Sequence, residues 1–193
     1  MEYIKGDYIE FGMFEGTSLI IGLECHLKTR QENGPIRKFW GLDSFEGGFK
    51  YSTEEDIHPF WKPGDFKSVY SKVEKRIRKY FNKRAEWEII PGFFEESIAG
   101  KNAREFGIKN IALALIDCDL GSPSKIALDF IKPALHEGSI IILDDYFAYK
   151  GSLTKGEAGA FEEFKIKYPE LNFRRIFDYG LGGRGFILVN EPF

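Results

Sequence analysis

Short apolar runs alternate along the chain with longer segments in which apolar residues recur three or four positions apart. Runs of four to eight apolar residues are typical of buried strands, and the longer spacing is typical of helices that pack on one face. The predicted strands are Tyr8–Phe11, Arg37–Leu42, Trp87–Ile90, Ile111–Ile116, Ser139–Leu143, Phe173–Tyr179 and Gly185–Val189. The predicted helices cover residues 16–30, about 66–82, 122–135 and 157–167, and a shorter helix follows a turn within Gly92–Ile98.

Strands that alternate with helices predict a mostly parallel sheet with helices on both faces. Ile111–Ile116 is apolar at every position, which is typical of a strand buried on both faces. The last two strands are joined by Gly180–Gly185, and a connection this short favours an antiparallel pair. The pattern therefore predicts an α/β fold, doubly wound and mostly parallel, with an antiparallel C-terminal strand pair.

Length and charge narrow the class of protein. The chain has 193 residues, which favours one domain over residues 1–193. Its 27 basic and 30 acidic residues give a net charge of −3, which predicts no basic surface for nucleic acid or for an anionic membrane. The longest apolar run is far shorter than the roughly 20 residues of a spanning helix. The first residues do not resemble a secretory signal, and the two cysteines do not form a disulfide framework. We therefore expect a soluble, cytoplasmic domain that binds neither nucleic acid nor membranes.

The turn after the first strand is the first candidate ligand site, because open α/β sheets bind ligands at the carboxyl ends of their strands. Gly12 permits a tight turn there, and Gly16 permits a close approach of the following helix. Phe14 takes the place of the middle glycine of a dinucleotide fingerprint, and Glu15 puts a negative charge where pyrophosphate would bind. S-adenosylmethionine fits better, because it carries no phosphate. An ordinary strand-to-helix turn is the alternative.

Asp43 ends the second predicted strand, where a carboxylate can accept hydrogen bonds from both hydroxyls of a ribose. An acid in this position also commonly serves as a turn or cap residue. The combination of Asp43 with the glycine-bearing turn of the first strand favours the ribose interpretation.

Acidic residues follow two neighbouring buried strands. Asp117 and Asp119 follow the fourth strand, and side-chain alternation is expected to put both on one face, with Cys118 pointing into the core. Asp144 and Asp145 follow the fifth strand. Carboxylates gathered from two strand ends would repel one another without a cation, and oxygen ligands favour Mg²⁺. The alternative is that Asp144 and Asp145 cap a turn while Asp117 touches only the cofactor.

Five segments of the sequence resemble the macrocin O-methyltransferase family, in the same order and along nearly the whole chain. They are Tyr8–Ser18, Trp40–Gly47, Pro91–Ser97, Ile116–Leu120 and Leu143–Tyr146. The Leu-Asp-Ser-Phe-Glu-Gly element and the Asp-x-Asp element with the later Asp-Asp pair are specific in combination. The resemblance implies a class I, Rossmann-like methyltransferase fold and the magnesium-dependent methylation of a sugar hydroxyl by S-adenosylmethionine.

The resemblance also implies a role for individual residues. The methionine side of the cofactor pocket would be formed by Glu10, Gly12, Phe14, Gly16 and Ser18. The ribose would lie at Asp43 and Ser44, and the adenine would lie at Gly92 and Phe94. Mg²⁺ would be held by Asp117, Asp144 and Asp145, with Asp117 also beside the cofactor. Asp119 would be the general base, taking the proton of a hydroxyl whose pKa the cation lowers.

The chain departs from the family in three places. Few residues precede the first strand, so we expect a more open cofactor pocket or one covered by a partner chain. Gly121–Lys125 replaces an aromatic and acidic stretch, and Gly48–Gly64 does not match the family. The acceptor is therefore predicted only as a small molecule that carries a sugar hydroxyl or another diol.

Other interpretations stay open at this point. A catechol-type O-methyltransferase also pairs an acidic metal site with S-adenosylmethionine, and a non-catalytic cofactor-binding subunit would need a partner; a homo-oligomer is compatible with each. His58 is either a second base or a solvated loop residue. Glu157 either borders the substrate or caps the helix that it begins.

Overall fold

The structure is a computed structural model that describes residues 4–30, 34, 36–47, 53–58, 60–62 and 64–190. The strands are β1 (Asp7–Phe11), β2 (Phe39–Asp43), β3 (Trp87–Pro91), β4 (Ile111–Ile116), β5 (Ile140–Leu143), β6 (Asn172–Tyr179) and β7 (Gly183–Val189). The α-helices are α1 (Thr17–Thr29), α2 (Tyr70–Phe81), α3 (Phe94–Ser97), α4 (Gly121–Ile131) and α5 (Gly156–Lys167). Short 3₁₀ helices are η1 (Glu54–Asp56), η2 (Ala103–Phe106) and η3 (Lys132–Ala134).

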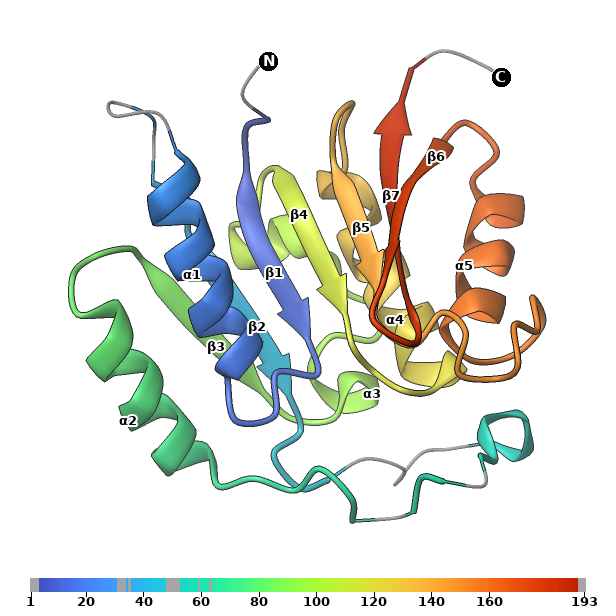
Figure 1. The fold of residues 1–193 in the computed structure, drawn as a ribbon, viewed down its shortest axis with the longest axis horizontal. Coiled ribbons are helices and arrows are strands. Elements are labelled where there is room, and N and C mark those ends of the chain that lie inside the picture. The colour runs from blue at the N-terminus through green and yellow to red at the C-terminus, as the bar shows by residue number, and fades with distance from the viewer. Residues whose placement is uncertain are drawn as a thin grey trace.

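The strands form one seven-stranded sheet in the order β3-β2-β1-β4-β5-β7-β6 (Figure 1). The pairs from β3 to β5 are parallel, whereas β7 runs antiparallel to both β5 and β6. The strand order reverses at β1, which has β2 on one side and β4 on the other. The predicted α/β, doubly wound fold with an antiparallel C-terminal pair is confirmed.

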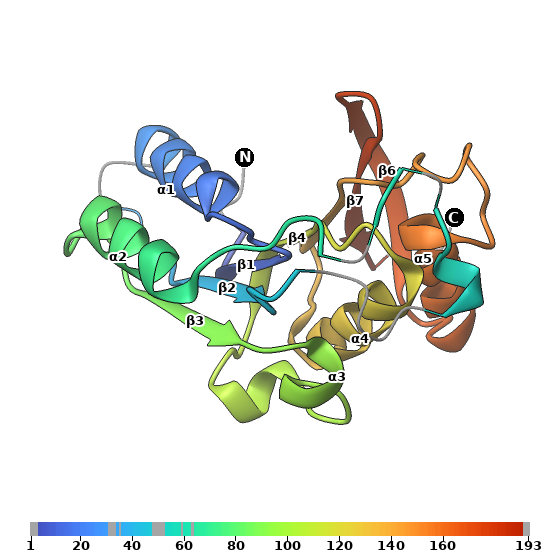
Figure 2. The same cartoon turned by 90° about the horizontal axis from the view of Figure 1, so that it is seen from below.

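Helices cover both faces of the sheet, and each face has its own core (Figure 2). On one face, α1 and α2 bury apolar residues at helical spacing, such as Leu23 and Ile77, against Phe39 of β2. On the other face, α3, α4 and α5 bury Leu128 and Phe161 among the remaining strand residues. The carboxyl ends of β1, β2, β4 and β5 consequently share one edge, between the two helical layers.

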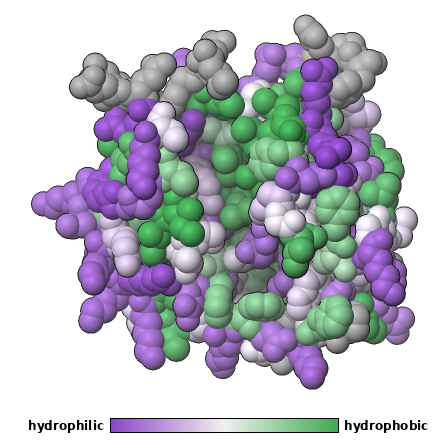
Figure 3. All heavy atoms as spheres, in the orientation of Figure 1, coloured by the Kyte–Doolittle hydropathy of each residue, from purple (hydrophilic) through white to green (hydrophobic). Residues whose placement is uncertain are grey.

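Part of the α1 and α2 face carries apolar side chains that are only partly buried. They belong to β4 and β5 and are Leu113, Leu115, Ile140 and Ile142. Figure 3 shows apolar atoms gathered in the middle of this face.

In the described part of the chain, no helix combines the length and the apolar character needed to cross a membrane.

The structure differs from the predicted boundaries where tertiary contacts decide the backbone. The helix predicted from residue 66 begins at Tyr70, because Phe66 has a positive φ of 60° and the Ser68 N–H donates to the Phe45 carbonyl at 3.3 Å. The helix predicted over 122–135 ends at Ile131 and continues only as η3. The second strand begins at Phe39 and not at Arg37, whereas β4 has the predicted bounds.

Candidate active site

The turn from β1 to α1 lies where the strand order reverses, the usual ligand position in an open α/β sheet. Gly12, Phe14 and Gly16 all have positive φ, at 84°, 46° and 73°. A Cβ on Gly12 would overlap the carbonyl oxygen of Asp117, so only glycine lets this turn lie against the segment after β4. The Phe14 ring is partly exposed and meets the ring of Phe66 edge-on at 6.0 Å.

Glu10 and Ser18 hold strand and helix together beneath this turn. Glu10 is fully buried, and its carboxylate accepts hydrogen bonds from the Tyr8 hydroxyl at 2.7 Å and from the Ser18 hydroxyl at 2.5 Å. Burial raises the pKa of Glu10 to about 7, and the two hydroxyl donors oppose that rise. Glu10 and Ser18 therefore shape the turn from below.

Asp43 connects the end of β2 to the same turn. Its carboxylate oxygens accept from the backbone N–H groups of Phe14 at 2.7 Å and Phe45 at 2.6 Å. Burial raises the pKa of this carboxyl. Ser44 stays local, accepting from the Glu46 N–H at 3.3 Å. Asp43 thus has the turn role that the sequence left open, and because each carboxylate oxygen accepts two hydrogen bonds, it keeps capacity for a ligand hydroxyl.

The predicted adenine contacts, Gly92 and Phe94, lie at different depths. The Gly92 N–H donates to the Asp43 carbonyl at 2.9 Å, which brings Gly92 beside the end of β2. The Phe94 side chain is buried and meets the Phe11 ring edge-on at 5.6 Å. Gly92 is therefore near the other cofactor candidates, whereas the ring of Phe94 packs in the core beneath them.

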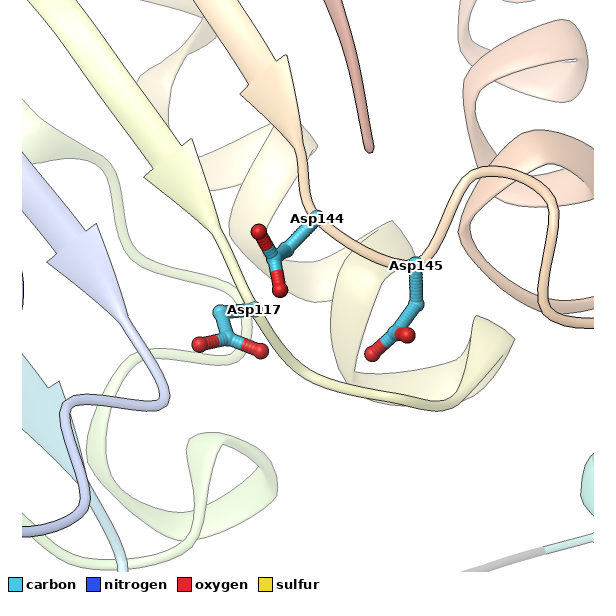
Figure 4. A group of neighbouring side chains, drawn as sticks. All are labelled: Asp117, Asp144 and Asp145. Carbon is cyan, nitrogen blue, oxygen red and sulfur yellow. The ribbon is translucent and has the colours of Figure 1, made fainter. Parts of the chain in front are cut away.

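Asp117, Asp144 and Asp145 come together after β4 and β5, as the sequence predicts (Figure 4). Each offers a carboxylate oxygen, and these atoms lie within 4.8 Å of one another. Burial, together with the charges of Asp144, Asp119 and Asp145, raises the pKa of Asp117 to about 9. A hard cation with oxygen ligands fits this donor set, because it would offset that repulsion.

Asp119 reaches the same group by a route that the sequence analysis did not foresee. Side-chain alternation along a strand is not the cause, since β4 ends at Ile116 and Asp119 has a left-handed backbone with φ of 61°. Its carboxyl nevertheless shares a hydrogen bond with that of Asp145, and burial raises its pKa. The Cys118 thiol packs against the core, as predicted, and burial raises its pKa.

Glu157 connects the two acidic loops, which are the loop of Asp117 and Asp119 after β4 and the loop of Asp144 and Asp145 after β5. It is fully buried, and its carboxylate accepts from the Cys118 N–H at 2.9 Å and the Asp145 N–H at 3.0 Å. This is neither of the roles considered from the sequence. The available signal is that Glu157 is the one acid among the small and apolar residues 156–161, which form the buried start of α5.

A segment of the long loop after β2 is attached to the far side of the group. Asp56 accepts from the Gly121 N–H at 2.9 Å and from the Ser122 hydroxyl at 2.7 Å, so it caps α4. His58 lies 3.1 Å from the Ala148 carbonyl oxygen, and its ring stacks on Trp61 at 4.1 Å. Figure 2 shows this segment beside α4 and α5.

The sequence did not predict that Asp56 caps α4, because this role depends on a contact between the loop and a helix 65 residues away. The unmatched stretch Gly48–Gly64 falls partly outside the described residues. Its described part lies on the acidic side of the edge, where His58 also acts electrostatically on Asp145.

The chain matches known proteins along most of its length. The family model described as macrocin-O-methyltransferase (TylF) matches residues 1–167. A relative from Streptomyces olivaceus, described as 8-demethyl-8-(2,3-dimethoxy-alpha-L-rhamnosyl)-tetracenomycin-C 4'-O-methyltransferase, is 24% identical over 148 residues. That match covers 74% of this chain and 54% of the relative, so the chain spans about half the length of the curated relative that it matches.

Two solved structures are similar in fold. The O-methyltransferase NovP superposes with a TM-score of 0.75 at 20% identity, covering 96% of this chain and 73% of NovP. CalS11, described as a calicheamicin methyltransferase, superposes with a TM-score of 0.72 at 22% identity, covering 95% of this chain and 72% of CalS11. The fold of this chain is thus the fold of these methyltransferases.

Proposed function

Since this chain belongs to the macrocin O-methyltransferase family, we propose that it methylates a sugar hydroxyl, or a hydroxyl of a similar diol, in a natural product or glycan. The methyl donor is S-adenosylmethionine, and the reaction requires a divalent cation such as Mg²⁺. The observation that carries the proposal is the group of Asp117, Asp144 and Asp145, placed beside the glycine-bearing turn of β1. The name of the Streptomyces olivaceus relative, which describes a rhamnosyl tetracenomycin, supports a sugar acceptor.

The turn after β1 and the end of β2 bind the cofactor in this proposal. Gly12 and Gly16 bring the backbone close to the methionine end, with Phe14 beside it, and Glu10 and Ser18 hold the turn in place. Asp43 accepts the ribose hydroxyls while it keeps its hydrogen bond from the Phe14 N–H. Gly92 lies on the adenine side. Phe14 and Glu15 obstruct a pyrophosphate, which argues against a dinucleotide.

The acidic side binds the cation and the acceptor. Asp117, Asp144 and Asp145 would hold the cation, and Asp119 takes the proton from the acceptor hydroxyl. When bound, S-adenosylmethionine supplies an activated methyl group and the cation lowers the pKa of the acceptor hydroxyl. Glu157 keeps the two acidic loops at a fixed separation through the Cys118 and Asp145 N–H groups. Fixed positions of both reactants supply much of the remaining acceleration.

A methylation panel tests the proposal. The purified chain is incubated with S-adenosylmethionine and with sugars, glycosides and catechols, and S-adenosylhomocysteine is measured with Mg²⁺ or with a chelator. We expect glycoside methylation that the chelator abolishes and Mg²⁺ restores, and that Asp145→Asn loses. Asp129→Asn is a matched control, because Asp129 pairs with Lys167 on the surface. Full activity in chelator would reject the cation site, and catechol methylation alone would reject the sugar acceptor.

Calorimetry tests the cofactor independently of the acceptor. S-adenosylhomocysteine should bind and NAD should not. Tight NAD binding without a response to S-adenosylhomocysteine would overturn the cofactor. Binding of S-adenosylhomocysteine with no methylation of any acceptor would favour a cofactor-binding subunit that needs a partner.

A further inference from the structure

Tyr179 brings a phenol hydroxyl to the acidic group from the C-terminal hairpin. Tyr179 is the last residue of β6, and its hydroxyl donates a hydrogen bond to Oδ1 of Asp144. The two residues are 35 positions apart in the chain. Tyr179 also lies beyond residues 1–167, the range that the family model matches.

The ring of Tyr179 has a prepared position on the neighbouring strand. Tyr179 pairs with Gly183 across the β6–β7 ladder. A Cβ on Gly183 would lie 2.8 Å from the ring atom Cδ1 of Tyr179 and closer still to two other ring atoms. The absence of a side chain on Gly183 therefore leaves the space that the Tyr179 ring occupies, and from there the hydroxyl reaches Asp144.

The hairpin that carries Tyr179 is tied to the segment after β5. Within the hairpin, Asp178 of β6 accepts from Arg184 Nε of β7 at 2.7 Å and from Arg175 Nη2 at 2.6 Å, which holds the two strands together. The Gly182 carbonyl accepts from the Phe147 N–H at 3.0 Å. The hydroxyl of Tyr179 is thus held on a strand end that is itself connected to the loop of Asp144.

We propose that Tyr179 is a positioning residue that fixes the Asp144 carboxylate in the orientation in which it faces Asp117 and binds the cation. A carboxylate that is hydrogen-bonded through one oxygen loses rotational freedom, and such partners of metal ligands change metal affinity by about 10–100-fold. A phenol is neutral at pH 7, so it orients the carboxylate without removing its charge. The inference rests on the cation site of the proposed function.

Tyr179→Phe tests the role, because it removes the hydroxyl and leaves the ring on Gly183. Mn²⁺ affinity is measured by titration with electron paramagnetic resonance detection of free Mn²⁺, and S-adenosylhomocysteine affinity by calorimetry. We expect Mn²⁺ to bind about 10–100-fold more weakly to the variant, with S-adenosylhomocysteine affinity unchanged. Tyr168→Phe is the matched control, because the Tyr168 hydroxyl also donates to a carboxylate, that of Asp129, at an exposed position.

A second variant separates positioning from a general loss of structure. Gly183→Ala pushes the Tyr179 ring away from its place on β7. As a single variant, Gly183→Ala should weaken Mn²⁺ binding. Combined with Tyr179→Phe, it should add little to the effect of that variant. Equal Mn²⁺ affinity in the wild-type chain and Tyr179→Phe would overturn this inference but leave the cation site intact. A wild-type chain that binds no Mn²⁺ would overturn the cation site and this inference together.

Discussion

The carboxyl ends of β1, β2, β4 and β5 form one edge of the sheet, and the buried acids in its two halves have different neighbours. The half proposed to bind the cofactor, here the cofactor half, contains Glu10 and Asp43. The half proposed to bind the cation, here the cation half, contains Asp117, Asp119, Asp144 and Asp145. Glu10 is fully buried, yet its pKa rises only to about 7, because two hydroxyls donate to it. Burial and then the charges of neighbouring carboxylates raise the pKa of Asp117 to about 9, and no hydroxyl donor is among the causes that act on it.

The difference shows that deep burial alone does not mark a ligand site. Glu10 and Asp43 each accept two hydrogen bonds from the protein, whereas the acids after β4 and β5 face one another, and Asp144 alone among them accepts from a described hydroxyl, that of Tyr179. Like charges gathered in a partly buried site cost free energy that an added cation would offset. The cofactor half is thus complete as a framework, and our proposal is that a cation completes the other half. The predictions below probe this contrast.

The largest effect is expected for Asp119→Asn in the cation half. This variant keeps the shape of the side chain and loses the proton acceptor, so kcat should fall by about 10²–10⁴-fold. S-adenosylhomocysteine affinity should stay as in the wild-type chain, and the residual rate should increase with pH as hydroxide replaces the base. Loss of cofactor or cation binding without a specific defect in kcat would place Asp119 in the binding site only.

Glu10→Gln should change how stability depends on pH. The folded pKa of Glu10 is raised from 4.5 to about 7, so its contribution is fully present below pH 4.5 and is lost as pH increases through 7. Relative to Glu10→Gln, the wild-type chain should lose up to roughly 3 kcal/mol of unfolding free energy between pH 4.5 and pH 8.

Urea unfolding at both pH values measures this difference. The groups acting on Glu10 are Tyr8, Ser18, Asp43 and Asp144, and all four side chains are kept in the variant. Glu24→Gln, at an exposed carboxylate paired with Arg84, is the control and should leave the pH dependence nearly unchanged. Parallel pH profiles of Glu10→Gln and the wild-type chain would contradict the prediction.

Mg²⁺ should stabilise the wild-type chain through the cation half. At a concentration 100 times Kd, binding to the folded state contributes about 2.7 kcal/mol, which for a chain of this size raises Tm by roughly 5–10 °C. Asp117→Asn should melt higher than the wild-type chain in chelator, because it removes one repelling carboxylate, and Mg²⁺ should then have little effect. Thermal melts of both chains, with Mg²⁺ and with chelator, measure these changes in Tm. A lower Tm of Asp117→Asn in chelator, or no rise in the wild-type Tm with Mg²⁺, would contradict the prediction.

Asp43→Ala should weaken cofactor binding without affecting Mg²⁺ binding. Hydrogen bonds to a charged acceptor contribute about 1.5–3 kcal/mol, so S-adenosylhomocysteine Kd should rise by roughly 10–150-fold. Ser44→Ala should have a smaller effect, because the described contacts of Ser44 are local. An unchanged Kd for Asp43→Ala would mean that the ribose is bound elsewhere.

Much of this arrangement follows from local sequence patterns. The run Ile111–Ile116 predicted β4 with its bounds, and parallel neighbouring strands necessarily bring Asp117 together with Asp144 and Asp145 at one edge. Boundaries failed where a tertiary contact decided them, as at Phe66, where the chain turns with a positive φ and α2 begins only at Tyr70.

The supporting residues of the site could not be predicted in the same way. Glu157 accepts from partners 39 and 12 positions away, and Tyr179 and Asp56 bond to partners 35 and 65 positions away. No periodicity or short motif encodes such separations. Asp119 was found for the wrong reason, since its left-handed backbone and not strand alternation turns its carboxyl toward Asp145.

The close approach of Gly12 to the Asp117 carbonyl has an evolutionary consequence. The two halves of the edge meet there through backbone alone, with no room for a Cβ. Side chains in either half can therefore drift, and a lineage can acquire a different acceptor or a different cation, as long as residue 12 stays glycine. In a collection of related sequences, we expect position 12 to be invariant even across branches that differ at Ser44 and in the loop of His58.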